Sequence, residues 1–453
     1  MTVEQNPLKD VIKNDLCTWC WICAEFKKSP YSINLDKFWK LKAFYKDGGT
    51  NLSKKESKEI SECCPFSNDA LNEDQISEIV FKDVPNKADF VWKYYSFYAG
   101  YVSEWLYREK GSSGWLWTWI LKELLETNKV DKVIHVKWTE NPLLFEYSIS
   151  DNIEELKKGA KSKYYPITLF WIMGYIQKND FKYIVVWIPC FLKALRLYCE
   201  KNELVKSRIR FTLWLVCGHL KSQKFWEMLA WQVWVKKNEI KAIDFREKNP
   251  NKSADSYNFS ATNKKWEKYE KNMKELFWWN WWANFFKYKA CDYCDDTFAE
   301  VADVMIGDAW IPPYSKESMW NNILITRNKE IEEMVLNGIQ ENRLKLDNIT
   351  YDQIIASQKA WINHKNSWLS YRLKYTKQDI KKRIVPWSLN VTLFYKCIFR
   401  LRVILRDFSH IFYRYAEKTW SFWVFKILIS PILFFYYGLY FFVYIKKKIK
   451  NVK

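Results

Sequence analysis

Short apolar runs and longer amphipathic stretches alternate along the middle of the chain, from about residue 76 to residue 330. The apolar runs are rich in β-branched and aromatic residues and read DKVIHV, KYIVVWIPC, RIRFTLWLVCGH, EIKAIDFR, ADVMIGDAW and NILITR. Between them lie segments with apolar residues at helical spacing, such as LKELLETNK and FLKALRLYCEKNE. Because buried strands that alternate with amphipathic helices are typical of α/β architecture, we predict an α/β (α+β) core.

The two ends of the chain differ from this core. Residues 1–75 hold the motifs CTWCWICAE and ECCPFSNDALNED, which predict a small, ferredoxin-like iron–sulfur module built around its cysteines. Residues 331–390 are polar at helical spacing and predict a helical segment. Residues 391–453 form an aromatic and basic tail that we expect to associate with a membrane.

The tail contains a stretch of nearly the length that spans a bilayer. Residues 427–445 carry no charge over nineteen positions, close to the ~20 residues that cross a membrane. Pro431 and Gly438 interrupt the stretch, and the KKKIK that follows favours the cytoplasmic side. Three arrangements stay open, namely an interfacial or re-entrant helix, a single span, and a helix packed on the body. We therefore predict a cytoplasmic protein that is peripheral to, or anchored in, the cytoplasmic membrane.

Charge and cysteine content narrow the class of protein. The net charge of +20 suits a nucleic acid, an acidic partner or an anionic membrane surface, but most Lys and Arg residues are scattered along amphipathic stretches. Such scatter is typical of a solvated surface, and we predict no nucleic-acid partner. The first residues lack the apolar core of a secretory signal. Eleven cysteines in a reducing compartment then indicate metal or redox chemistry rather than disulfides.

The motif CTWCWICAE predicts an iron–sulfur site. Cys17, Cys20 and Cys23 have the C-x2-C-x2-C spacing of loops that wrap a 4Fe–4S cluster, and the Cys64-Pro65 step supplies a typical fourth ligand. Cys63 is the adjacent competitor for that role. A four-thiolate zinc site tolerates similar spacing and is the alternative.

Four further cysteines stand at or just after predicted strand ends, where ligands gather in α/β sheets. They are Cys190 in IPC, Cys217 in VCGH, and Cys291 and Cys294 in CDYC. Together they suffice for a second 4Fe–4S cluster. The alternative is that Cys190 and Cys217 are small buried apolar residues, which is common for free cysteine.

Eight sequence blocks are specific enough to suggest a family. Within about residues 10–330 they read, in order, CTWCWICAE, CPFSNDALNED, GSSGWL, KSKYYP, IPCFLKAL, VCGHLKS, IDFREK and CDYCDDTFAEVADVMIGDAW. In this order they resemble the coenzyme F420 hydrogenase/dehydrogenase beta subunit family of flavin and iron–sulfur proteins. The resemblance implies FAD, favours ligand roles for the four later cysteines, and implies family domains at 76–160 and 161–330.

The resemblance also implies where a flavin would bind. GSSG precedes a segment of helical spacing, where free amides and the helix dipole can hold a diphosphate, although a serine N-cap explains the motif equally well. The predicted flavin-binding residues are Gly111, Ser112, Ser113, Gly114, Lys161, Ser162, Lys163, Tyr164 and Asp308. A solvated turn at KSKYY and a helix cap at Asp308 are the plainer interpretations. His219 is a candidate proton donor, although a lone histidine is more often structural.

These features together predict an oxidoreductase. It would use FAD and 4Fe–4S clusters to move electrons between a low-potential donor, either reduced ferredoxin or a deazaflavin, and an unidentified substrate. Two alternatives stay open. One is an electron-transfer subunit of a larger complex with another redox partner, and the other is a zinc-stabilised, non-enzymatic scaffold at the membrane.

Tryptophan and glycine contents are both abnormal. The chain has 27 Trp and 11 Gly, whereas ~7% glycine and ~1% tryptophan are usual. Some bacterial lineages read UGA as glycine where a common translation table reads tryptophan, so we hypothesise that several tryptophans are glycines in the native chain. The suspected positions are Trp19, Trp21, Trp115, Trp187, Trp214 and Trp320, whereas Trp310 in GDAW fits the family as it stands. We expect several of these indoles to lie in solvent or to block a cofactor pocket.

Overall fold

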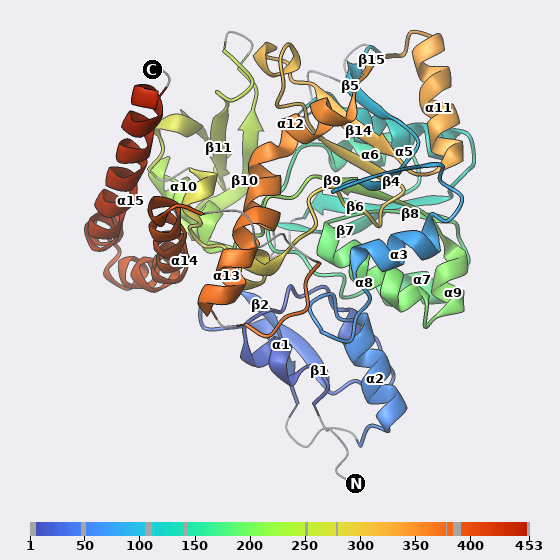
Figure 1. The fold of residues 1–453 in the computed structure, drawn as a ribbon, viewed down its shortest axis with the longest axis horizontal. Coiled ribbons are helices and arrows are strands. Elements are labelled where there is room, and N and C mark those ends of the chain that lie inside the picture. The colour runs from blue at the N-terminus through green and yellow to red at the C-terminus, as the bar shows by residue number, and fades with distance from the viewer. Residues whose placement is uncertain are drawn as a thin grey trace.

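The computed structural model describes residues 6–46, 51–104, 111, 113–139, 144–249, 252–277, 280–376, 378–383 and 391–450, with Ser367 and the last eight given by their backbone alone. Figure 1 shows a central sheet flanked by helices, with the N-terminal segment below it and a pair of long C-terminal helices beside it. The coarse prediction of a mixed α/β protein with C-terminal helices is therefore confirmed.

An eight-stranded mixed sheet forms the centre of the protein, in the order β15-β5-β14-β13-β9-β8-β6-β7. The four inner strands β13, β9, β8 and β6 run parallel. Antiparallel strands extend the sheet at both edges. The strands are β5 (Phe97–Val102), β6 (Lys132–Trp138), β7 (Phe145–Ser150), β8 (Tyr183–Trp187), β9 (Ile209–Leu215), β13 (Val304–Asp308), β14 (Asn322–Thr326) and β15 (Leu344–Asn348).

Helices cover both faces of this sheet. One face packs against α5 (Leu116–Glu126), α6 (Ile153–Lys158) and α11 (Lys329–Gln340). The other packs against α7 (Ile172–Lys178), α8 (Pro189–Cys199), α9 (Glu203–Arg208) and α12 (Tyr351–Ile362). Every residue of β8 is buried, as expected for a strand covered on both sides. Pro189 starts α8 at a position where its missing N–H leaves no hydrogen bond unmade, so β8 passes directly into α8.

The N-terminal segment is a small layer of its own. It contains α1 (Lys9–Lys13), a hairpin of β1 (Tyr31–Leu35) and β2 (Leu41–Tyr45), α2 (Lys54–Cys63) and α3 (Glu73–Val80). Reciprocal capping boxes, Ser53 with Glu56 and Asn72 with Gln75, fix the starts of the last two helices. A hairpin of β3 (Asn86–Ala88) and β4 (Trp92–Tyr94) follows. The ferredoxin-like character of this segment stays a prediction.

A second hydrophobic core joins the tail to the body. It contains residues of α10 (Lys224–Gln232) and of the antiparallel sheet β10 (Ile240–Glu247), β11 (Asn258–Asn263) and β12 (Lys268–Asn272). Against these pack α14 (Leu393–Thr419) and α15 (Phe422–Lys450), which lie side by side in Figure 1. The tail helices are thus part of the folded body.

The segment 331–390 departs in part from its prediction. It contains α11, α12 and α13 (Trp368–Thr376), as expected, but β15 lies between them and pairs with β5 in the central sheet. The alternation in LKLDN covers only five residues between two helices, too few for the pattern to predict a strand.

Candidate functional site

Four cysteines of the N-terminal segment meet in one pocket. Cys17, Cys20 and Cys23 lie in and around the loop between α1 and β1, and Cys64 is the residue that ends α2. Pro65 cannot continue the helix, so the chain turns there. All four cysteines line the same pocket. The structure therefore brings together the first predicted ligand set.

The surroundings of these thiols suit a metal cluster. The backbone N–H groups of Trp19 and Ala43 donate to Sγ of Cys17 at 3.3 and 3.2 Å. Burial raises the pKa of Cys20 well above its usual value, and the charge of Cys64 raises it further. Burial likewise raises the pKa of Cys64 to about 12. Since buried charges need partners or metals, four thiolates in an apolar pocket need a cationic group to compensate them.

Cys63, the competitor for the fourth ligand position, lies elsewhere. It is buried in the last turn of α2, and burial raises its pKa, which the charge of Lys201 partly offsets. Among the described residues that line the cysteine pocket, Cys64 is present and Cys63 is not. The geometry therefore favours Cys64.

The second predicted set also converges. β8 and β9 are neighbouring parallel strands, so their carboxyl ends carry Cys190, at the start of α8, and Cys217 to the same edge of the sheet. Burial raises the pKa of Cys190 well above its usual value, and the charges of Cys291, Cys217 and Cys294 raise it further, in that order. The N–H of Leu220 donates to Sγ of Cys291 at 3.2 Å.

A buried lysine faces this second set. Nζ of Lys365 donates to Sγ of Cys294 at 3.5 Å. Burial acts to lower the pKa of Lys365, but the charges of Cys294 and Cys217 outweigh it, so its pKa is raised. A cation held among thiolates is the arrangement expected beside a negatively charged site. In the part of the chain that the structure describes, no three His, Cys, Asp or Glu side chains form a group suited to a single metal ion.

The two sets lie next to each other. The charge of Cys20, in the first set, also raises the pKa of Cys190, in the second. The indole of Trp19 lies between elements that carry both sets, with its ring centroid 6.2 Å from that of Phe191 and 4.0 Å from that of Tyr288. A redox group held by one set would therefore have a near neighbour in the other.

The predicted flavin loop meets two other motifs. Oγ of Ser113 donates to Oδ1 of Asp308 at 2.9 Å, and Asp308 forms an ion pair with Arg246 at 2.8 Å. Nζ of Lys248 donates to the carbonyl of Ser113 at 3.1 Å. Gly111, Ser113 and Gly114 precede α5, whereas Ser112 lies outside the described residues. The IDFREK motif is visible in the sequence, but Arg246 and Lys248 were not predicted as site residues, because their partners are distant in the chain.

The KSKYY segment borders this polar cluster. Lys161 forms an ion pair with Asp244, and Lys163 donates to backbone carbonyls of its own turn, including that of Lys161 at 2.8 Å. Burial lowers the pKa of Lys163 to about 7. Tyr164 is half-buried against Phe245. Desolvation raises its pKa, and the nearby charge of Arg246 opposes that rise. Tyr164 is therefore near enough to Arg246, Asp308 and Cys217 for their charges to act on it.

His219 is buried close to the second set. Its ring stacks on Trp281, with centroids 4.8 Å apart, and neither ring nitrogen has a hydrogen-bond partner among the described residues. Burial lowers the pKa of His219 well below its usual value, and the nearby charges of Lys221 and Lys287 lower it further. The imidazole is therefore neutral, and its role as a proton donor stays a prediction.

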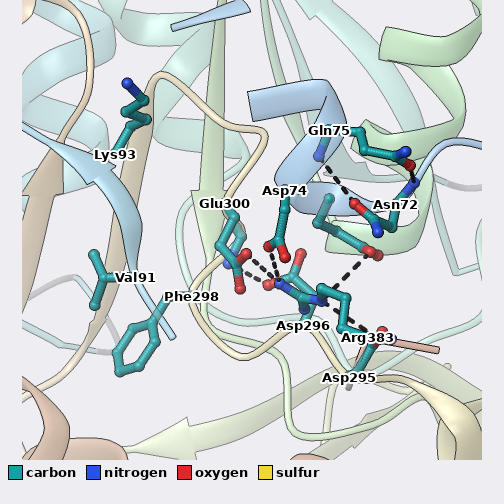
Figure 2. A network of polar contacts seen from close by, with 12 residues as sticks. Asn72, Asp74, Gln75, Val91, Lys93, Asp295, Asp296, Phe298, Glu300 and Arg383 are labelled. Atoms are coloured by element: carbon teal, nitrogen blue, oxygen red, sulfur yellow. Dashed lines mark hydrogen bonds and ion pairs between the residues drawn. The ribbon is translucent and has the colours of Figure 1, made fainter. Parts of the chain in front are cut away.

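One buried network ties the two cysteine-bearing motifs together, as Figure 2 shows around Arg383. Arg383 forms ion pairs with Asp74 at 2.9 Å, with Asp295 at 3.4 Å and with Glu300. Asp74 belongs to α3, ten residues after Cys64, and Asp295 follows Cys294 directly. The acidic runs in both motifs were visible in the sequence, but their common partner, 83 or more residues away, was not.

Comparisons with known proteins identify the family. The N-terminal domain of the coenzyme F420 hydrogenase/dehydrogenase beta subunit matches residues 97–173, and the C-terminal domain of that beta subunit matches residues 180–352. These matches contain the second cysteine set and the flavin-loop cluster. Among solved structures, the chain is similar to one from the xenon-derivatized F420-reducing [NiFe] hydrogenase complex of Methanosarcina barkeri, at 14% identity and a TM-score of 0.49, covering 67% of this chain and 100% of that one. No curated protein matches the chain. Since the two domains together span more than half of its residues, the chain belongs to the coenzyme F420 hydrogenase/dehydrogenase beta subunit family.

Proposed function

We propose that the protein is an FAD- and 4Fe–4S-dependent oxidoreductase. It would move electrons between a low-potential donor, such as reduced ferredoxin or a deazaflavin, and a substrate whose identity is open. The observation that carries the proposal is that eight cysteines from five separate segments form two neighbouring sets of four. Membership of a family of redox subunits supports the same interpretation.

The donor chemistry fits iron–sulfur clusters. Cys17, Cys20, Cys23 and Cys64 would hold one, and Cys190, Cys217, Cys291 and Cys294 would hold the other. When bound, such clusters accept and pass on single electrons. The chain itself supplies thiolate ligands, N–H donors to sulfur and burial that excludes water. These features tune a cluster through hydrogen bonding and charge.

The polar cluster beside α5 suits a flavin dinucleotide. Arg246 and Lys248 bring two cations to the residues around Ser113 and Asp308, where a diphosphate needs positive charge. Tyr164 packs against the rings of Phe245 and Trp281 next to this cluster, a suitable position for contact with a further aromatic ring. When bound, FAD exchanges electron pairs with a substrate and single electrons with clusters. The chain would bind and orient it.

A second function is supported by one observation. Both matching domains are described as those of a beta subunit, which favours an electron-transfer subunit that works with partner chains. Such a protein would hold the same cofactors but would show no turnover without its partner. A colourless, zinc-loaded protein would instead support a scaffold.

Matched cysteine variants test the proposal. Cys64→Ser should remove about four of about eight irons per chain and leave the rest of the visible spectrum, because it lies in the first pocket. Cys63→Ser is the control, since it changes an adjacent buried thiol outside that pocket and should leave the iron count unchanged. Cys190→Ser should remove the other four irons. Full iron content in both Cys64→Ser and Cys190→Ser would contradict the proposal.

A further inference from the structure

Tryptophan occupies half of the positive-φ backbone positions in the described part of the chain. Seventeen non-glycine residues in the described part of the chain have positive φ, and nine of them are tryptophan. At 27 of 453 residues, tryptophan should account for about one. The nine are Trp19, Trp21, Trp39, Trp92, Trp115, Trp234, Trp266, Trp320 and Trp420. Glycine, which favours this region, occurs there once among the described residues, at Gly100.

Two of the nine close β-hairpins in the same way. In the β1–β2 hairpin the N–H of Trp39 donates to the carbonyl of Asp36 at 2.9 Å, and φ of Trp39 is 59°. In the β11–β12 hairpin the N–H of Trp266 donates to the carbonyl of Asn263 at 3.0 Å, and φ is 66°. Each is a three-residue loop whose third residue is left-handed, the position that normally takes glycine.

Two others end helices in the same way. Trp234 follows α10, and the N–H of the next residue donates to the carbonyl of Ala230 at 3.0 Å. Trp420 follows α14, and the next N–H donates to the carbonyl of Ala416 at 3.1 Å. Both are Schellman motifs, whose left-handed residue is usually glycine and sometimes asparagine. The corresponding residues after α5 and α11 are indeed asparagines, Asn128 and Asn342.

We infer that the native chain carries glycine at these left-handed positions, by reassignment of one codon. Of the six positions suspected from the sequence, Trp19, Trp21, Trp115 and Trp320 are left-handed. Trp187 and Trp214 are not: they are register partners in β8 and β9, with buried indole N–H groups that have no partner among the described residues. Glycine there would remove these buried indole N–H groups from strands β8 and β9 rather than relieve backbone strain.

The expectation that several of the six suspected indoles lie in solvent was wrong. Five are buried, because the chain packs their large apolar rings even where the backbone disfavours them, and Trp21 lines the first cysteine pocket. Among the left-handed tryptophans the most exposed are instead Trp234, Trp266 and Trp420, at 84%, 72% and 76%. At these three sites the indole is not buried, so packing does not explain why tryptophan would be favoured there.

Peptide mass spectrometry of the protein isolated from its source organism tests this inference. Peptides across Asp36–Lys40 and Asn263–Glu267 should carry glycine in place of Trp39 and Trp266. A peptide containing Trp310, which has an ordinary backbone and fits the GDAW motif, should carry tryptophan and shows that indole-containing peptides are detected. Tryptophan at Trp39 or Trp266 would overturn the inference.

A different observation, the two faces of α15, carries a second inference. One face packs on α14 and the body through Phe425, Ile429, Leu433 and Tyr436. The opposite face exposes two rows of apolar residues at intervals of seven, namely Ile427, Phe434 and Phe441, and Leu428, Phe435 and Phe442. In the described part of the chain, α15 is the helix whose length and composition would allow it to cross a membrane.

The packing of α15 argues against a span. α14 lies along it and carries charged side chains, among them Arg402, which donates to the hydroxyl of Tyr436 at 3.3 Å, and Arg406, paired with Asp292 beside Cys291. Taking α15 across a bilayer would bring these charges into hydrocarbon or strip the helix from its core. A helix held on one side can offer a membrane only its other side.

We propose that α15 lies in the plane of an anionic membrane surface, with its exposed aromatic rows in the interface. The charge of the tail fits that occupant, because residues 391–453 contain twelve Lys and Arg against two Asp and Glu, a net +10 out of +20 for the whole chain. Apolar burial and attraction of lysines to anionic lipid together hold such helices. This surface would keep the redox centre at the membrane without insertion.

Vesicle flotation of the full-length holoprotein tests the proposal. Binding to phosphatidylglycerol–phosphatidylcholine vesicles should exceed binding to pure phosphatidylcholine by about tenfold or more, and high salt should release the protein. Phe434→Asp with Phe441→Asp should abolish flotation, whereas Phe170→Asp, at a ring on the body that is 59% exposed, should not. Deletion of the tail is unsuitable, since it removes core residues of α14.

Three results would overturn this proposal. They are resistance to salt and alkaline extraction, which indicates a span; unchanged flotation of the double variant; and a lipid-free dimer that the double variant converts to monomer. The last would assign the face to a second copy of the chain.

Discussion

Replacing Trp266 by glycine should stabilise the protein relative to replacing it by alanine. Trp266 is the third loop residue of the β11–β12 hairpin, with φ of 66° and a side chain that is 72% exposed. Both substitutions remove the indole and its contact with the Lys241 ammonium, 5.3 Å from the ring centroid. The two variants therefore differ in backbone preference alone.

The magnitude follows from two opposing effects. A residue with a Cβ destabilises the folded state by about 1–2 kcal/mol when its backbone is left-handed, and glycine avoids this strain. Glycine also has more conformational freedom in the unfolded chain than alanine, which reduces this advantage by about 0.4–1 kcal/mol. The glycine variant should thus be more stable than the alanine variant by about 0.5–1 kcal/mol. Trp234 and Trp420 are also exposed and lie in separate motifs, so their effects should add to that of Trp266. The variant with glycine at all three positions should therefore have an unfolding free energy about 2 kcal/mol higher than the variant with alanine at all three.

Urea denaturation measures this difference as a shift in midpoint at constant slope. Trp171 is the control, because its φ of −98° lies in the right-handed region, where alanine should be the more stable substitution. The sign of the glycine–alanine difference should therefore reverse between Trp266 and Trp171. Equal stability of the two triple variants, or the same sign at both sites, would refute the reasoning.

Three further predictions concern the buried charges. Arg383→Gln should lower the unfolding free energy by about 3–5 kcal/mol in denaturant melts, because it leaves the buried Glu300 carboxylate without its cation, while the exposed Arg400→Gln should change little. Burial lowers the pKa of His135 to about 3, below its unfolded value, so the unfolded chain binds the proton more readily. Stability should therefore fall as pH drops from about 6.5 to 3, by up to about 1.4 kcal/mol per pH unit. His135→Gln should flatten this dependence of unfolding free energy on pH, and equal slopes for the two proteins would contradict the prediction. Lys365→Met should lower the midpoint potential of the cluster proposed at the second cysteine set, because it removes a cation beside Cys294; an unchanged potential in a redox titration would count against that role.

The α/β core was predictable because its strands are buried on both faces and read as continuous apolar runs, as KYIVVW does in β8. The edges of the sheet were harder to predict. β15 and β5 are short, and their pairing joins residues more than 240 positions apart in the chain, such as Leu344 and Val102. No local pattern encodes a partner at that distance.

The first cysteine set was suggested by the C-x2-C-x2-C spacing, whereas the second was suggested by cysteines at predicted strand ends and by the family resemblance. What spacing could not predict was their surroundings. Lys365 comes from a π-helical turn 71 residues beyond Cys294, and Arg383 lies further still. Lys365 is buried and Arg383 largely so, although the sequence context of both looks solvated, and only the fold brings them to the cysteine motifs.

The most direct test of the proposed function is the iron, acid-labile sulfide and flavin content of the intact protein purified without oxygen. Two sets of four cysteines predict about eight irons and eight sulfides per chain, with one FAD and a brown colour. A colourless protein that holds zinc and no flavin would contradict it.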